Sequence, residues 1–445
     1  MKTRFFFIFF TFIISFTSKS QSGFRFSGIN KDRVQVSFKK VNNLIVLPLE
    51  INGKKLSFIL DTGVNKTILF NLTENDSIGL LNTTKVTLRG LGKGEAVNAL
   101  VSKKNTFKIK NLVSNNETIF VILKDYFDLS SKMGTTIHGI IGYNLLKDLI
   151  VKVNYNSKKI DFYNPKTFKY KKCKKCETVP FNFYRKKPFI KAKVSLDTIG
   201  NKFIETLLLV DSGGSDAMWL FENSKAEIKT PKRFFNDLLG EGLSGPIFGN
   251  RSRIPQFKLG RFKIEKPTVS FLDSASTHNA REFKARNGSI GGGILKRFKV
   301  WIDYPNNKFT FKKNGSFTSG FNYNMSGLDI VYNGEELVKE AAIRNIENTF
   351  NQKLNEKHSV SLVKSYSFNF KPSYKILNVI KNSPAYNAGL LKDDVIISIN
   401  GKAVHQFQIG EIIQKFQERD KKKIKMVIKR NNVKMKFEFR LHKSV

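Results

Sequence analysis

The chain has 445 residues, enough for two or three domains, and its 40% apolar content with 41 phenylalanines can fill real cores. Its formal net charge of +41 would suit a protein that binds nucleic acid or an anionic surface. Lysine is spread through every segment, however, and no arginine–aromatic stripe or nucleic-acid motif occurs. We therefore expect no specific nucleic-acid partner, while some affinity for anionic envelope polymers stays open.

The N-terminus has the pattern of a secretory signal peptide. Lys2 and Arg4 precede an apolar run over residues 5–16, and small and polar residues follow up to Ser22. We expect residues 1–21 to be removed and the mature protein to be exported to the periplasm, the extracellular space or the cell surface. No later stretch is long and apolar enough to predict a transmembrane segment.

The first motif with chemical meaning lies at residues 56–70, LSFILDTGVNKTILF. Residues 44–60 predict a hairpin that turns at Asn52–Gly53, and its second strand delivers Asp61. A carboxylate at the end of a buried strand is costly unless it is paired or used. Thr62 and Gly63 follow, and glycine gives the loop around the carboxylate its conformational freedom.

Downstream, the sequence predicts further strands and one flexible tip. Gly90, Leu91 and Gly92 lie in a glycine-rich stretch between β-like runs, which predicts a mobile hairpin. The motif Ile140–Ile141–Gly142 comes next, and then a short helix is expected over residues 143–150. Residues 151–163 predict a hairpin that turns at Asn156–Ser157.

The same plan recurs about 150 residues later. Asp211, with Ser212 and Gly213, follows the apolar run Leu207–Val210 and stands 150 residues after Asp61. The glycine-rich tip recurs at Gly240 and Gly242, and the Ile-Gly pair recurs at Ile290–Gly291. Because several features repeat in register, the sequence predicts two duplicated lobes.

The connector between the lobes carries both cysteines of the chain, Cys173 and Cys176, in a lysine-rich run. A zinc site would need two more ligands, and the five histidines lack ligand spacing. In an exported protein we expect a local disulfide, with free thiols as the alternative. Neither a metal nor a cofactor is expected.

Residues 44–315 resemble the pepsin/retropepsin superfamily through these paired motifs. The resemblance implies that Asp61 and Asp211 are catalytic carboxylates and that the neighbouring residues Thr62, Gly63, Ser212 and Gly213 support the dyad. It also implies flaps at Gly90, Leu91 and Gly92 and at Gly240 and Gly242. Val64 and Gly214 stand where this superfamily most often has alanine.

The last third of the chain differs in kind. The charged segment 339–358 is expected to be partly helical, and residues 383–401 predict a helix, a strand and an Asn-Gly turn. A helix over 409–416 and a hairpin that turns at Asn431–Asn432 complete a small α+β unit. This unit resembles a bacterial PDZ domain, which implies a peptide-binding loop at Gly327, Leu328, Asp329 and Ile330.

The predicted fold class is mainly β: a double-lobed acid-protease β-barrel fold plus a small α+β PDZ domain. The expected domains are the signal peptide (1–21), the first lobe (22–165), a linker (166–180), the second lobe (181–316) and the PDZ domain (317–445). The whole order resembles an exported aspartyl protease family of the Bacteroidetes type.

The expected function is a monomeric aspartic endopeptidase that acts on protein or peptide substrates. Its PDZ domain would take the C-terminal peptide of a partner. One alternative is a catalytically inactive peptide-binding protein of the cell envelope, and another is a cationic binder of anionic envelope polymers. A further variant, in which each lobe pairs with a second chain, is unnecessary because one chain supplies both halves.

Overall fold

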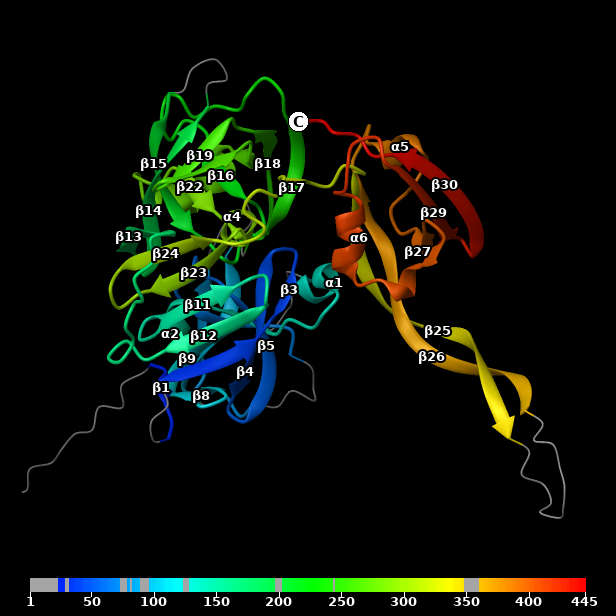
Figure 1. The fold of residues 1–445 in the computed structure, drawn as a ribbon, viewed down its shortest axis with the longest axis horizontal. Helices are drawn as coiled ribbons and strands as arrows, with labels where there is room; N and C mark the ends of the chain where they lie inside the picture. The colour runs from blue at the N-terminus through cyan, green and yellow to red at the C-terminus, as the bar shows by residue number, and fades with distance from the viewer. Residues whose placement is uncertain are drawn as a thin grey trace, which may run out of the picture.

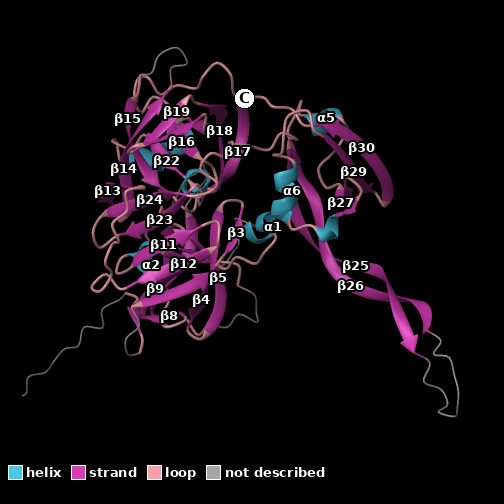
Figure 2. Ribbon diagram, in the orientation of Figure 1, coloured by secondary structure: helices cyan, strands magenta, loops and turns pink. Residues whose placement is uncertain are grey.

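The computed structural model describes residues 23–28, 32–72, 78–80, 82–88, 96–122, 128–196, 202–242, 245–347 and 360–445. Strands dominate, and the few helices are short (Figure 2). Two β lobes lie one against the other, and a third domain lies beside both of them (Figure 1). The predicted signal peptide lies outside the described residues.

The first lobe is built on one mixed sheet. Its strands are β1 (Arg25–Phe26), β3 (Lys39–Val41), β4 (Leu44–Ile51), β5 (Lys54–Leu60), β6 (Thr67–Leu69), β7 (Thr84–Leu88), β8 (Val97–Ile109), β9 (Leu112–Val121) and β10 (Gly139–Ile141). The hairpin β4–β5 turns where predicted, with φ of 49° at Asn52 and 89° at Gly53. β10 runs parallel to β5, so Ile141 lies beside Leu60, the residue directly before Asp61.

Two short helices belong to this lobe, α1 (Leu129–Met133) and α2 (Tyr143–Leu146). The helix expected over residues 143–150 is therefore too long. Ile150 already pairs with Tyr163 in the next hairpin, and this strand pairing ends the helical segment early.

The second lobe repeats this plan. Its strands are β14 (Lys187–Ser195), β15 (Ile204–Val210), β16 (Met218–Phe221), β17 (Phe235–Gly242), β18 (Gly245–Arg253), β19 (Gln256–Leu259), β20 (Phe262–Glu265), β21 (Thr268–Leu272) and β22 (Gly288–Ile290). Its helices are α3 (Ser274–Thr277), η1 (His278–Glu282) and α4 (Gly292–Leu295). β22 runs parallel to β15 and antiparallel to β16, as β10 does with β5 and β6.

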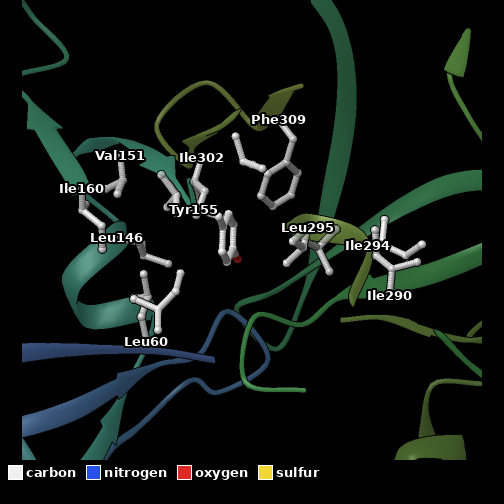
Figure 3. Packing of buried hydrophobic residues seen from close by; sticks show 14 of the residues in the cluster. Leu60, Leu146, Val151, Tyr155, Ile160, Ile290, Ile294, Leu295, Ile302 and Phe309 are labelled. Atoms are coloured by element: carbon white, nitrogen blue, oxygen red, sulfur yellow. The ribbon is translucent and has the colours of Figure 1, made fainter. Parts of the chain in front are cut away.

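A sheet to which both lobes contribute joins them. Its strands, in spatial order, are β13 (Cys176–Tyr184), β24 (Lys308–Lys313), β23 (Phe298–Asp303), β11 (Ile150–Asn154), β12 (Lys159–Tyr163) and β2 (Arg33–Ser37). The two lobes meet where β11 pairs with β23. One hydrophobic core runs from Leu60 of the first lobe through Val151 and Ile302 to Ile290 of the second (Figure 3). This continuity makes the two lobes one structural body.

The linker predicted over residues 166–180 is only partly a connector. From Cys176 onward the chain is β13, which pairs with β24 through its first half and with β14 through its second half. Apolar residues such as Val179 alternate with polar ones there, and this alternation suits a strand with one buried face. Cys173 and Cys176 form the expected local disulfide just before this strand.

The third domain has its own core, which begins at Tyr323. Its strands are β25 (Leu328–Glu347), β26 (Val360–Val379), β27 (Val395–Ile399), β28 (Lys402–Ala403), β29 (Lys423–Arg430) and β30 (Val433–Arg440). Its helices are α5 (Pro384–Asn387), η2 (Val404–Gln406) and α6 (Ile409–Lys415). Phe317 and Phe321 still pack on the lobe core, so the structural boundary lies a few residues beyond the predicted 317.

Most local predictions in this domain are confirmed. Ser383 caps α5 by accepting a hydrogen bond from Tyr386, and Gly389 ends the segment with φ of 88°. The Asn431–Asn432 turn connects β29 and β30. Residues 339–347 are strand and not helix, because they pair along β26 in an unbroken ladder in which Leu337 faces Phe370.

Candidate active site

Asp61 and Asp211 stand at equivalent places in the two lobes. Each follows the strand that ends in the lobe core, β5 or β15. The backbone N–H of Asp61 donates to the carbonyl of Ile141 at 2.9 Å, and that of Asp211 donates to Ile290 at 2.9 Å. The repeat predicted from the sequence thus places both carboxylates in the same local frame.

The residues after the two aspartates interlock the lobes. Thr62 N–H donates to Oγ of Ser212 at 3.0 Å, and Ser212 N–H donates to Oγ1 of Thr62 at 2.9 Å. The Thr62 hydroxyl donates onward to the carbonyl of Val210 at 2.5 Å, and that of Ser212 donates to Leu60 at 2.8 Å. Both side chains are buried, so this symmetric network fixes the two aspartate loops against each other.

Gly63 and Gly213 let the carboxylates of Asp61 and Asp211 approach each other closely. Gly63 N–H donates to Oδ1 of Asp61 at 2.6 Å, and Gly213 N–H donates to Oδ1 of Asp211 at 3.0 Å. A Cβ at Gly213 would lie 2.2 Å from Cγ of Asp61, and one at Gly63 would lie 3.0 Å from Cγ of Asp211. Each carboxylate therefore occupies the space that a side chain on the other lobe's glycine would fill.

The electrostatics of the pair follow from this closeness. Burial, the charge of Asp211 and a hydrogen bond with Asp211 together raise the pKa of Asp61 well above its ordinary value. The Gly63 N–H and the charge of Lys187 act in the opposite direction but do not cancel the rise. Asp61 accordingly holds a proton under conditions in which an isolated aspartate has lost it.

Three residues near the dyad were not found by sequence reasoning. Burial lowers the pKa of Lys187, although the charges of both aspartates oppose this effect. Burial also lowers the pKa of Arg286 to about 10, against the charge of Asp211, and its guanidinium lies 4.9 Å from the ring of Phe221. Burial and the charge of Asp61 raise the pKa of Tyr304. None of the three has a motif or a spacing that could have signalled it.

A second buried cluster links the Asp211 loop to the hairpin β17–β18. Arg251 donates to both carboxylate oxygens of Asp216, at 3.0 and 3.2 Å, and to Asp237 at 2.6 Å. Trp219 Nε1–H also donates to Asp216 at 2.8 Å. The guanidinium thus connects the loop after Asp211 with the hairpin that contains Gly240 and Gly242.

Of the two predicted flaps, the structure describes the glycines of the second and not those of the first. Gly240, with φ of 151°, lies at a bulge in β17, and Gly242 pairs with Gly245 at the hairpin tip. A glycine at the bulge fits a hairpin that must bend. Gly90, Leu91 and Gly92 lie outside the described residues.

A polar cavity of about 420 Å³ lies beside the Asp61 loop. Asn65 lies at its edge and donates to the carbonyl of Arg185 across the lobes at 3.1 Å. The cationic residues that line it are Lys66, Lys147, Arg185 and Lys186. Glu117 lines the cavity too, but the four cations outnumber this carboxylate, so the combined charge favours an anionic group there.

The predicted peptide-binding residues of the third domain divide between a loop and a strand. Gly327, with φ of 81°, precedes β25, and a Cβ there would lie 2.1 Å from Cβ of Ser383. Leu328, Asp329 and Ile330 already belong to β25. The backbone N–H of Leu328 donates to Oγ of Ser326 at 3.0 Å, so this donor is used within the loop.

Two further observations concern metals and membranes. Among the described residues, His, Cys, Asp and Glu side chains do not gather in groups of three that could hold a metal ion. Within the same residues, no helix combines the length and the apolar character needed to cross a bilayer.

Fold and site together define an aspartyl-protease-like unit followed by a PDZ domain, as predicted. An aspartyl protease family model matches residues 47–145, and a PDZ domain model matches residues 375–430. The former covers the Asp61 lobe, whereas the Asp211 lobe is recognised by its own repeat of the site. The mainly β fold class is confirmed.

Among solved structures, the crystal structure of aspartic proteinase from Irpex lacteus is similar. It shares 13% sequence identity with a TM-score of 0.43, over 65% of this chain and 99% of that chain. None of the curated proteins compared with the chain matches it.

Proposed function

We propose that the protein is an exported aspartic endopeptidase that hydrolyses peptide bonds with a water activated by Asp61 and Asp211. The observation that carries this proposal is the interlocked dyad. Two lobes place two carboxylates against each other's glycine loops, and the pKa of one of them is raised. A fold element without catalytic use has no need for two carboxyl groups in one place.

The chemistry follows from one proton shared by two carboxyl groups. The ionised carboxylate accepts a proton from water, and the water oxygen attacks the carbonyl carbon of the scissile bond. The protonated carboxyl group of the pair donates to the carbonyl oxygen and stabilises the tetrahedral diol. When the C–N bond breaks, the leaving nitrogen receives a proton from the carboxyl group that accepted it from the water. No covalent intermediate is needed.

The surroundings of the dyad suit a substrate in extended conformation. The hairpin β17–β18 belongs to the lobe that carries Asp211. Arg251 on β18 donates hydrogen bonds to Asp237 on β17 and to Asp216 in the loop after Asp211. A peptide can pair its backbone with such a hairpin, while pockets beside it select side chains. We propose that the PDZ domain binds a peptide of the substrate or of a partner protein.

Export is proposed from the N-terminal sequence alone. The basic residues Lys2 and Arg4 and the apolar run after them form a secretion signal. Secretion of a full-length fusion to a reporter enzyme, compared with one that lacks residues 1–21, tests this part of the proposal. Equal secretion of the two fusions would contradict it.

The deciding experiment is cleavage of a diverse peptide library between about pH 3 and pH 8 by the wild type, Asp61→Asn and Asp211→Asn. Cleavage by the wild type and its loss in each variant support the proposal. Pepstatin is a useful additional probe, but resistance to it does not contradict a dyad. If the wild type cleaves nothing while peptides still bind to it, the chain is an inactive peptide-binding protein.

A further inference from the structure

The helix α1 of the first lobe lies against the PDZ domain. Its Cα atoms come within 8 Å of both β25 and α6, and Figure 1 shows α1 beside these two elements. At its end, a Cβ on Gly134 would lie 2.9 Å from Cγ2 of Ile409, the first residue of α6. Residues 128–134, here named the α1 segment, thus contact two elements of another domain.

These two elements are the ones that a peptide strand would meet. β25 pairs with β26 along one edge, and no described strand pairs with its other edge. A strand edge presents unpaired N–H and C=O groups, which an extended peptide can bind by adding a strand. We use the name β25–α6 groove for the unpaired edge of β25 next to α6, whose Cα atoms come within 8 Å of those of β25.

Charge also connects the α1 segment with the groove. Burial raises the pKa of Asp329, near the start of β25, and the charge of Asp237 raises it further, whereas the charge of Lys132 in α1 lowers it. The charge of Lys132 thus favours the ionised form of Asp329, whose Oδ2 also accepts a hydrogen bond from Asn378 at 3.1 Å. Another occupant of this place keeps that favourable contribution if it also carries a positive charge.

The PDZ domain contacts the second lobe as well. The ring of Phe235 on β17 lies 5.1 Å from that of Tyr323, and Arg233 Nε–H donates to the carbonyl of Ser444 at 2.8 Å. The domain thus bridges the α1 segment of one lobe and the hairpin strand β17 of the other. An occupant that displaces the α1 segment would release one half of this bridge.

We propose that the β25–α6 groove has two mutually exclusive occupants: the α1 segment in the free chain, and an extended peptide of a partner protein that carries Lys or Arg opposite Asp329. Partner binding then frees the PDZ domain from the first lobe. This inference rests on the proposed peptide binding by the PDZ domain and is independent of catalysis. It makes the groove a surface that is closed until a basic peptide competes for it.

The first test is a disulfide between Gly134→Cys and Ile409→Cys, made in an Asp61→Asn background so that no peptide is digested. A Cβ at Gly134 lies 3.2 Å from Cβ of Ile409, close to the roughly 3.5–4.5 Å of natural disulfides. The probe is an immobilised library of random decapeptides with a fixed central Lys or Glu. Asp61→Asn alone, treated with the same reductant, controls for reduction of the native Cys173–Cys176 bond.

We expect the reduced protein to bind Lys peptides at least about tenfold more strongly than the oxidised one, since displacement of α1 is then allowed. Glu peptides should bind weakly in both states because they repel Asp329. Equal binding of Lys peptides in the oxidised and reduced states would overturn the proposal, because the staple would then not close the groove. Absence of peptide binding in both states would overturn it too.

The second test replaces Lys132 by Glu and needs no engineered cysteine. The new carboxylate repels Asp329, so amide hydrogens of residues 128–134 should exchange faster and Lys peptides should bind more tightly. Lys103→Glu, an exposed position on β8 of the same lobe, is the matched control and should change neither measurement. If Lys132→Glu changes neither the amide hydrogen exchange of residues 128–134 nor the binding of Lys peptides, α1 does not occupy the groove. These outcomes do not depend on whether the wild type cleaves peptides.

Discussion

Thr62 and Ser212 exchange hydrogen bonds across the junction of the two lobes, each backbone N–H donating to the other residue's hydroxyl at 3.0 and 2.9 Å. The two residues are 150 positions apart in the sequence. The exchange lies directly beside the dyad, so the same bonds join the lobes and set the position of both carboxylates. Stability and catalysis should therefore change together when this contact is altered.

The first prediction concerns Thr62→Val, which keeps the shape of the side chain and removes its hydroxyl. The Ser212 N–H loses its acceptor and the Val210 carbonyl loses its donor, both in buried surroundings. Each unpaired buried group costs about 1–3 kcal/mol of unfolding free energy. Urea denaturation measures the loss, and Thr62→Ser, which retains the hydroxyl, should lose much less. Equal stability of Thr62→Val and the wild type would contradict the interlock.

The second prediction concerns the pH dependence of stability. Because the pKa of Asp61 is raised in the folded protein, the folded state binds this proton more tightly than the unfolded state. The wild type is therefore not penalised below the unfolded pKa of about 3.9, and it loses stability as pH rises through the folded-state pKa. Asp61→Asn carries no such charge. Its melting temperature should match the wild type near about pH 3 and exceed it at about pH 7.

Asp161→Asn is the control, because the pKa of Asp161 is lowered in the folded protein whereas that of Asp61 is raised. Burial would raise the pKa of Asp161, but hydrogen bonds from Arg33 and Gln35 and the charge of Lys152 outweigh it and lower that pKa. Asp161 therefore stabilises the fold above its unfolded pKa, and this stability is lost as pH falls through the lowered folded-state pKa. Asp161→Asn should lower the melting temperature at neutral pH. If both variants shift in the same direction there, the assigned electrostatics of Asp61 are wrong.

The third prediction compares two adjacent glycines. A Cβ at Gly213 would meet Cγ of Asp61 at 2.2 Å, whereas one at Gly214 would have its nearest neighbour, the carbonyl oxygen of Asp211, at 3.6 Å. Gly213→Ala must push the carboxylates apart, and a displacement of about 1 Å costs on the order of a hundredfold in rate. Gly214→Ala should retain activity. Kinetics on one cleaved peptide compare them, and comparable kcat/KM values for both variants would contradict the close approach of the dyad.

Much of this site could be predicted from the sequence because its determinants are local and occur twice. The aspartate loops, the hairpin turns at Asn52–Gly53 and Asn431–Asn432, and the cap at Ser383 depend on residue types at fixed spacing. The long β25–β26 ribbon could not be predicted, because the charged residues after Leu337 become strand only through pairing with a segment further along the chain.

The charged residues that act on the dyad from distant parts of the sequence could not be predicted either. Lys187 and Arg286 interact electrostatically with the dyad from a strand and a loop that carry no motif, and many lysines of this chain look alike in the sequence. The contact of α1 with the PDZ domain joins segments that are separated in the sequence by the whole second lobe. Neither segment has a sequence pattern that predicts contact with the other. Such contacts are set by the packing of whole domains.

The last prediction concerns Arg251, a buried residue whose guanidinium holds the half-buried Asp216 and Asp237 together. Arg251→Met leaves two carboxylates close to each other without a cation, and removal of one partner from a buried ion cluster costs about 3–5 kcal/mol. Lys108→Met removes the partly exposed contact with Glu50 and should cost at most about 1 kcal/mol. Urea unfolding at neutral pH measures both variants. Because protonation removes the repulsion between the two carboxylates, Arg251→Met should recover part of its stability in acid. A loss as small as that of Lys108→Met, with no recovery in acid, would mean that the cluster does not hold the Asp211 loop to the hairpin.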